Sequence, residues 1–195
     1  MSTADQTPPA AVVPQPLRVL FVCTANIARS PYAEHRAAQL LADYPMIHLA
    51  SAGIPGYPGR PMDTGMATIL HEHGGSADGH VSQTLSSDLV AEADVVLTFQ
   101  FAQHMRVLDE WPQFARRVMG LNQFADAVSR LYWPATGVEL VAQAHAAARP
   151  DSMTWDISDP YKRGMARARA CAAEIEAALA RIVPAVTGQR PGAAD

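Results

Sequence analysis

Leu17-Arg-Val-Leu-Phe-Val-Cys23-Thr-Ala-Asn-Ile-Ala-Arg29-Ser-Pro31 is the stretch of sequence that decides the fold. Its first half, Leu17–Cys23, is a short and mostly apolar run, which is typical of a buried strand in a parallel sheet. Ser30 and Pro31 then begin a helical pattern, because both residues are favoured at the start of a helix. A strand that passes through a short loop into a helix indicates an α/β domain.

The loop between this strand and helix carries a cysteine and, after five residues, an arginine. The backbone N–H groups of such a loop attract an anion, as does the start of the helix that follows. The guanidinium of Arg29 can bind two phosphate oxygens at once. The same positive field favours the thiolate form of Cys23, which is the nucleophilic form. The pattern therefore predicts a loop that binds a phosphate group and attacks it from the sulfur.

The composition is that of one ordinary globular domain. The 195 residues are 49% hydrophobic and 17% charged, and the net charge of −4 argues against a nucleic-acid partner. No run reaches the roughly 18 apolar residues of a membrane span, and the start of the chain lacks the features of a signal peptide. The two cysteines have neither the spacing of a disulfide framework nor that of a zinc motif. A free cysteine suits a reducing compartment, so the expected location is the cytoplasm, while the oligomeric state stays unknown.

Helices and short apolar strands alternate along the chain, which favours a parallel α/β sheet over a helical bundle. We expect a disordered arm over 1–16, a single domain over 17–184 and a disordered tail over 185–195. The expected strands are 17–23, 47–51, 94–98 and 117–120, and the expected helices are 30–43, 63–73, 86–92, 100–110 and 164–183. Residues 121–149 carry helical patterning that is interrupted around Trp133-Pro134.

Three separated blocks of the sequence resemble the low-molecular-weight protein-tyrosine phosphatase family. The blocks are Val22–Pro31; Ser51-Ala-Gly53 with Tyr57, Gly59, Pro61, Asp63, His80 and Ser82 after it; and Asp156-Ile-Ser-Asp159-Pro160-Tyr161. A lone C-x5-R motif is common by chance, but this motif followed by Ser-Pro and joined by a late Asp-Pro-Tyr is specific. The resemblance implies a flavodoxin-like, three-layer α/β fold with a four-stranded parallel sheet of order 2-1-3-4. The active site would then lie at the carboxyl ends of the strands.

The resemblance also implies the catalytic residues. Cys23 would attack phosphorus and form a phosphocysteine, and Arg29 would stabilise the charge on the phosphate oxygens. Asp159 would protonate the leaving phenolate and then activate the water that hydrolyses the intermediate. Asp156 is the alternative acid if the loop has a different register. The expected substrate is a phosphotyrosine protein or an aryl phosphate.

Other residues of the site follow from the same resemblance. The phosphate-binding loop would consist of Thr24, Ala25, Asn26, Ile27, Ala28 and Ser30, with Asn26 and Ser30 shaping the loop and contacting the sulfur. Tyr57 and Tyr161 would wall the substrate slot. We expect no metal and no other cofactor, because the loop amides and Arg29 supply the positive field.

The sequence departs from the family pattern at four places. Ala25 replaces a frequent glycine, which raises the question whether the backbone there needs a positive φ. Ala28 replaces a second cysteine that can protect the nucleophile, so Cys23 should be lost more easily to irreversible oxidation. Lys162 stands where many members have a second tyrosine. A helical insertion over 121–155 is longer than usual and is a candidate lid of the substrate entrance.

Two other functions compete with phosphotyrosine hydrolysis. A thioredoxin-coupled arsenate reductase shares the fold but needs resolving cysteines, and the only cysteine after Cys23 is Cys171, an implausible partner. A non-catalytic phosphoryl-binding module would have no need of Asp159. A metal site near His71 and His73 is disfavoured, because alternating histidines at a helix end do not share a face, and a solvated helix end is expected instead. For His80 we expect a structural contact near the loop.

Overall fold

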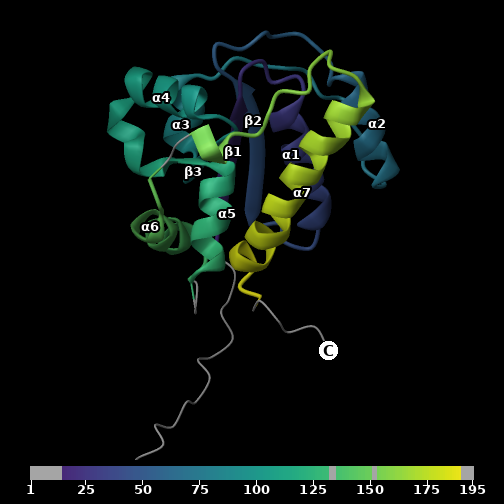
Figure 1. Ribbon diagram of the computed structural model, residues 1–195. Coiled ribbons are helices and arrows are strands. Elements are labelled where there is room, and N and C mark those ends of the chain that lie inside the picture. Colours follow the sequence, from purple (N-terminus) through teal and green to yellow (C-terminus); the bar gives the residue numbers. More distant parts are fainter. Residues whose placement is uncertain (1–14, 132–134, 151–152, 190–195) are drawn as a thin grey trace, which may run out of the picture.

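A four-stranded parallel sheet forms the centre of the protein (Figure 1). The computed structural model describes residues 15–131, 135–150 and 153–189, so most of the expected arm, part of the tail and Trp133-Pro134 lie outside the described residues. The strands are β1 (Leu17–Cys23), β2 (Ile47–Gly53), β3 (Val95–Thr98) and β4 (Val118–Gly120). Their order is β2-β1-β3-β4, which confirms the expected fold class and strand order.

Helices cover both faces of the sheet, which gives three layers. The helices are α1 (Arg29–Leu40), α2 (Thr64–Glu72), α3 (Ser87–Glu92), α4 (Phe101–Glu110), α5 (Leu121–Ser129), α6 (Gly137–Ala147) and α7 (Met165–Val186), with short 3-10 turns η1 (Pro112–Arg117) and η2 (Met153–Trp155). Side chains alternate along β1. Val19 and Phe21 pack with α1, α2, α5 and α7, whereas Leu20 and Val22 pack with α3 and α4 on the opposite face. Burial on both faces explains why β1 reads as a nearly continuous apolar run.

The register of the sheet brings three chain segments together at one edge. Cys23 ends β1 beside Gly53, the last residue of β2, and Val22 pairs with Thr98 at the end of β3. The segments that follow these strands therefore meet at the carboxyl end of the sheet, where α/β folds place their ligands.

Gly53 lets the first two of these segments approach closely. A Cβ atom at this position would lie only 2.8 Å from the carbonyl carbon of Ala25 and 2.9 Å from the backbone nitrogen of Asn26. No side chain fits there without moving the loop after β1. This contact explains the glycine that follows Ser51-Ala in the second sequence block.

Helix α1 is fixed behind this loop by a buried tyrosine. The hydroxyl of Tyr32 donates a hydrogen bond to Glu176 of α7 at 2.9 Å, and Arg36 forms an ion pair with the same carboxylate oxygen at 2.7 Å. Burial, together with the hydrogen bond to Glu176, raises the pKa of Tyr32, so its hydroxyl stays protonated. The long helix α7 therefore supports the element that begins at Arg29.

The last helix is longer than the sequence indicates. A proline normally ends a helix, and the expected helix stops at residue 183, but α7 continues through Pro184 to Val186. Ala185 and Val186 are buried in the core, and Thr187 donates hydrogen bonds from its backbone and its hydroxyl to the carbonyl of Val183. Tertiary packing thus overrides the local signal in the final turn.

Within the helical insertion, α6 lies away from the carboxyl end of the sheet. Helix α6 packs against α5 and η1, and it borders a cleft with Asp94 and Arg117, which immediately precede β3 and β4. These residues mark the amino ends of the strands. Figure 1 shows α6 at this end of the sheet, away from the loop after β1. The position of α6 therefore argues against a lid over Cys23.

Candidate active site

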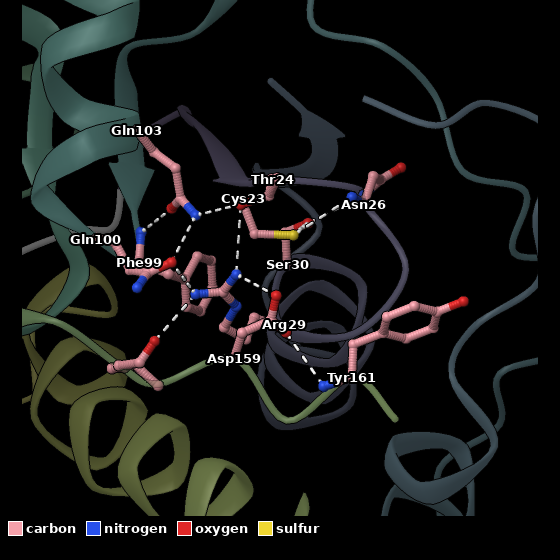
Figure 2. Close-up of polar contacts among 11 residues, drawn as sticks. Cys23, Thr24, Asn26, Arg29, Ser30, Phe99, Gln100, Gln103, Asp159 and Tyr161 are labelled. Carbon is pink, nitrogen blue, oxygen red and sulfur yellow. Dashed lines mark hydrogen bonds and ion pairs between the residues drawn. The ribbon is translucent and has the colours of Figure 1, made fainter. Parts of the chain in front are cut away.

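The sulfur of Cys23 lies at the centre of the loop that joins β1 to α1. Its Sγ atom lies 3.0 Å from the Ser30 hydroxyl and accepts a hydrogen bond from the backbone N–H of Asn26 at 3.3 Å (Figure 2). The family resemblance implies contacts from both of these residues to the sulfur. Donors at these positions stabilise a negatively charged sulfur.

The carbonyl groups of residues 23 to 28 all accept hydrogen bonds. The donors are the backbone N–H groups of Ile54, Gly56, Tyr57, Asp63 and Tyr32 and the Nε2 atom of His80. Five of these six donors come from outside the loop and α1, so the surrounding chain holds the carbonyl oxygens outward. A loop with its carbonyls outward directs its N–H groups inward and forms a concave anion site. This arrangement fits the prediction that the backbone of Thr24, Ala25, Ile27 and Ala28 belongs to a phosphate-binding loop.

Asn26 takes the strained position of the loop. Its φ angle is 58°, in the left-handed region that asparagine tolerates better than most residues, while Ala25 does not have a positive φ. The side-chain amide of Asn26 donates to the hydroxyls of Ser30 at 3.0 Å and Ser51 at 2.7 Å, and its oxygen accepts from the backbone of Gln83 at 2.9 Å. Ala25 therefore occupies a backbone conformation that does not require glycine.

Arg29 is the first residue of α1, and it is only 1% exposed. Its Nη1 atom donates to the side-chain oxygen of Gln100 at 2.6 Å and to the carbonyl of Ile157 at 3.0 Å. Its Nη2 atom forms an ion pair with Asp159 at 3.0 Å. The remaining N–H donor, Nε, is buried and has no hydrogen-bond partner among the residues that the structure describes. A buried donor of this kind fits an anionic acceptor, since leaving it unpaired is costly.

The structure separates the two aspartates that the sequence offers as acids. An oxygen of Asp159 lies beside Arg29 in the loop, and its other oxygen accepts from the backbone N–H of Tyr161 at 3.2 Å (Figure 2). Asp156 instead accepts from the backbone N–H of Phe101 at 2.7 Å, at the start of α4. Asp159 is the carboxylate that reaches the cysteine loop, and Asp156 caps a helix.

Two glutamines that the sequence analysis missed complete the support of Arg29. Gln103 is buried; its oxygen accepts from the backbone of Phe99 at 3.1 Å, and its amide donates to the Thr24 hydroxyl at 2.9 Å and to Gln100 at 3.2 Å. Gln100 then binds Arg29 directly. The sequence does contain a signal for them: two glutamines three residues apart follow the buried strand β3, at the end of the sheet where ligands bind.

We predict that Gln103→Leu lowers kcat/KM for an aryl phosphate by about 5- to 150-fold, the equivalent of roughly 1–3 kcal/mol for a lost buried hydrogen-bond network. The leucine removes the hydrogen bonds from this amide to Gln100 and Thr24, so Gln100 no longer holds Arg29 in its alignment. Steady-state hydrolysis with separate kcat and KM values measures the effect.

Gln123→Leu is the matched control for this change. Gln123 is a buried glutamine at the junction of β4 and α5, where it binds the backbone of Gly120 and Arg149 and does not contact Arg29 or Thr24. Both variants should lose thermal stability, but only Gln103→Leu should lose activity per folded molecule. Equal kcat/KM values for the two variants would show that Gln103 serves the fold alone.

Two tyrosines lie near the loop with exposed rings. Tyr57 is 58% exposed and Tyr161 is 41% exposed. The Tyr57 backbone is held by Ala25 and by the Ser82 hydroxyl, at 3.4 Å and 2.6 Å. Figure 2 shows the Tyr161 ring on the side of the loop away from Gln100 and Gln103. Lys162 places its Nζ atom 5.3 Å from the centre of the Tyr161 ring, a cation–π contact in place of a second tyrosine.

The histidines around residue 73 do not gather into one site. His73 contacts the Tyr32 hydroxyl at 3.2 Å, and Glu72 forms an ion pair with Arg169 of α7 at 2.6 Å. The imidazole of His80 donates to the carbonyl of Asn26 at 2.9 Å, which is the structural contact expected for it. The segment around His71 and His73 thus serves packing between α2, α1 and α7.

Residues 18–134 match the low molecular weight phosphotyrosine protein phosphatase family, and this match covers more than half of the chain. The chain belongs to this family. The family membership confirms the resemblance that the cysteine loop indicates, while the Asp-Pro-Tyr segment lies beyond the matched residues.

Individual relatives agree with the family assignment. The probable low molecular weight protein-tyrosine-phosphatase EpsP of Ralstonia nicotianae is 32% identical over 105 residues, which are 54% of this chain and 70% of that protein. The low molecular weight protein-tyrosine-phosphatase Etp of Escherichia coli is 29% identical over 108 residues, or 55% of this chain and 71% of that protein.

Solved structures extend the likeness over most of the chain. The tyrosine phosphatase AmsI of Erwinia amylovora superposes with a TM-score of 0.65 at 26% identity and covers 86% of this chain and 91% of its own. The YwlE arginine phosphatase of Geobacillus stearothermophilus gives a TM-score of 0.68 at 24% identity, with 86% and 90% covered. At this identity the second likeness establishes the fold alone.

Proposed function

We propose that this family member hydrolyses phosphotyrosine or a related aryl phosphate through a phosphocysteine intermediate. The observation that carries the proposal is the arrangement around Arg29. A buried guanidinium lies beside the Cys23 loop, and Gln100 and the Ile157 carbonyl anchor its Nη1 atom. Its Nε donor has no partner in the described part of the chain and is therefore suited to an anion. Asp159 approaches the same guanidinium from the third sequence block.

The first chemical step uses Cys23 and Asp159 on opposite sides of phosphorus. The thiolate of Cys23 forms the P–S bond while the bond from phosphorus to the phenolic oxygen breaks. Asp159 gives its proton to that oxygen, because phenolate is a poor leaving group when phenol has a pKa of about 10. Arg29 and the loop N–H groups bind the phosphate oxygens as charge moves onto them.

The second step reverses the role of the acid. Water attacks phosphorus as the P–S bond breaks, and the ionised Asp159 accepts the proton of that water. The products are inorganic phosphate and the Cys23 thiolate. Cys23 and Asp159 are then back in their starting states, and water is the one co-reactant that the cycle consumes.

The exposed rings of Tyr57 and Tyr161 are suited to the aromatic part of the substrate. A phosphotyrosine ring is long enough to keep its phosphate in the loop while it packs against such side chains. We place the reaction in a reducing compartment, the cytoplasm, because both cysteines are free and the mechanism needs an unoxidised Cys23. No helix within the described ranges is long and apolar enough to cross a membrane.

The structure gives no support to a reductase that resolves its intermediate with a second thiol. The only other cysteine is Cys171, which is buried in α7. Burial raises the pKa of the Cys171 thiol to about 12, so it stays protonated and unreactive near neutral pH. The persistence of Asp159 beside Arg29 likewise favours an enzyme over a module that only binds phosphate.

The function is tested by incubating the reduced protein with phenyl phosphate and a phosphotyrosine peptide and measuring released phosphate. We expect kcat/KM to exceed that for a phosphoserine peptide of the same sequence by at least about tenfold, since the short serine side chain cannot use the aromatic walls. Hydrolysis of phosphoarginine but not of aryl phosphates would contradict the substrate class. Folded protein that hydrolyses none of these compounds would contradict the enzyme itself.

A further inference from the structure

Glu34, His35 and His80 form a cluster on the back of the cysteine loop that the proposed mechanism does not use. Each of the three half-buried side chains offers one ligand atom, and these atoms lie within 4.8 Å of one another. They line a cavity of about 330 Å³ together with Asn26, Ser51 and Gln83. Two of the ligands come from α1 and the third comes from a loop about 45 residues later. We propose that these three residues bind a divalent transition-metal ion of the Zn²⁺ class.

The two histidines already have the outer hydrogen bonds that metal-binding histidines use. The Nδ1 atom of His35 donates to the carbonyl of Ser76 at 2.8 Å, and the Nε2 atom of His80 donates to the carbonyl of Asn26 at 2.9 Å. A carbonyl only accepts, so the proton of each neutral ring must reside on the nitrogen named. The other nitrogen of each ring then carries a lone pair. Metal-binding histidines are held in this way, with one ring N–H on a carbonyl and the second nitrogen on the metal.

Glu34 supplies the carboxylate ligand of the site, and Asp78 also lines the cavity. One oxygen of Glu34 accepts a hydrogen bond from the Ser51 hydroxyl at 2.5 Å, which orients the carboxylate and leaves its second oxygen for a metal. Two histidines and one glutamate are a donor set that Zn²⁺ uses with a water molecule as the fourth ligand. Ligand atoms at about 2.1 Å from a tetrahedral ion lie roughly 3.4 Å from one another. The three ligand atoms here lie within 4.8 Å of one another, so side-chain rotations that move them by about an ångström would bring them to that spacing.

The cluster is connected to the nucleophile through Asn26. His80 holds the carbonyl of Asn26, and Ser51 joins Glu34 to its side-chain amide. Asn26 in turn donates its backbone N–H to the Cys23 sulfur (Figure 2). A metal ion here would therefore lie outside the catalytic centre. It would nevertheless fix Ser51 and Asn26, which connect the cluster to the loop.

Zinc also binds thiolates, so the test uses the full-length Cys23→Ser variant, which lacks the active-site sulfur. Titration calorimetry with ZnCl₂ should show one saturable site on this protein. Adding His35→Ala should weaken zinc affinity by about 100-fold or more, because losing a ligand exceeds the roughly 10- to 100-fold cost of losing an outer partner. Adding His48→Ala, which removes an exposed histidine of β2, is the matched control and should leave the affinity unchanged.

Thermal melts of the same three proteins give a second readout. Zinc should raise Tm for Cys23→Ser and for its His48→Ala derivative, and it should not raise Tm for the His35→Ala derivative. Co²⁺ should give the intense visible absorption of a tetrahedral complex only where His35 is present. The proposal is overturned if zinc does not saturate the Cys23→Ser protein below millimolar concentration. It is equally overturned if affinity and Tm shift are the same with and without His35.

Discussion

Cys23→Ser should abolish phosphotyrosine hydrolysis, with kcat reduced by at least roughly 10⁴-fold, as expected when the nucleophile of a covalent mechanism is removed. A serine hydroxyl is not ionised near neutral pH and attacks phosphorus poorly. It can still contact the Ser30 hydroxyl and the backbone N–H of Asn26, which surround the sulfur in the wild-type protein. Binding of inorganic phosphate, measured by calorimetry, should therefore persist in the variant while turnover is lost.

Cys171→Ala is the control for this variant. It removes the second cysteine from the core of α7 and should lower thermal stability without lowering kcat per folded molecule. Rapid acid quench of the wild-type enzyme followed by mass spectrometry should show a phosphoryl group on the Cys23 peptide. Substantial turnover by Cys23→Ser, or loss of turnover in Cys171→Ala, would contradict the assignment of Cys23 as the nucleophile.

Asp159→Asn should have the second-largest effect and should depend on the leaving group. For phosphotyrosine we expect kcat to fall by about 10²- to 10⁴-fold, because an amide cannot donate the proton that phenolate needs. For p-nitrophenyl phosphate, whose leaving group is a much weaker base, formation of phosphocysteine should be far less affected. A stopped-flow burst of p-nitrophenolate followed by slow turnover would report this difference directly.

Asp156→Asn provides the matched control three residues earlier. Asparagine at this position keeps an oxygen that can accept from the backbone of Phe101, so the start of α4 remains capped. The ratio of kcat values for the two substrates should stay at its wild-type value. If Asp156→Asn instead shows the leaving-group dependence, the acid has been misassigned and the Arg29–Asp159 ion pair is not the catalytic arrangement.

Much of the fold was predictable because its signals are local. The apolar run of β1, the Ser-Pro start of the first helix and the short strand β3 are readable from neighbouring residues. The end of α7 was not, because Pro184 gives a local stop signal that the packing of Ala185 and Val186 outweighs. The place of α6 was also unpredictable, since helical periodicity does not say which end of a sheet a helix covers.

The candidate active site also has a part that was predictable from local sequence and a part that was not. Cys23 and Arg29 lie in one motif, and the contacts of Asn26 and Ser30 to the sulfur follow from that motif and the family resemblance. Gln100 and Gln103 escaped notice because their partners, Arg29 and Thr24, are more than seventy residues away along the chain. Glutamines after a strand are common, and only the pairing of β1 with β3 brings these two to the loop.

The sequence by itself determined the strand, loop and helix around Cys23–Pro31, the order of the elements and the family, since these depend on short-range patterns. Only the tertiary structure decided that Asp159 rather than Asp156 faces Arg29, because the carboxylates differ in direction and not in chemistry. It also assigned the positive φ to Asn26 and left Ala25 free of that strain. The meeting of Glu34 and His35 with His80 likewise depends on how α1 packs beside a distant loop. Contacts of this kind are set by sheet register and helix packing, and no local pattern encodes them.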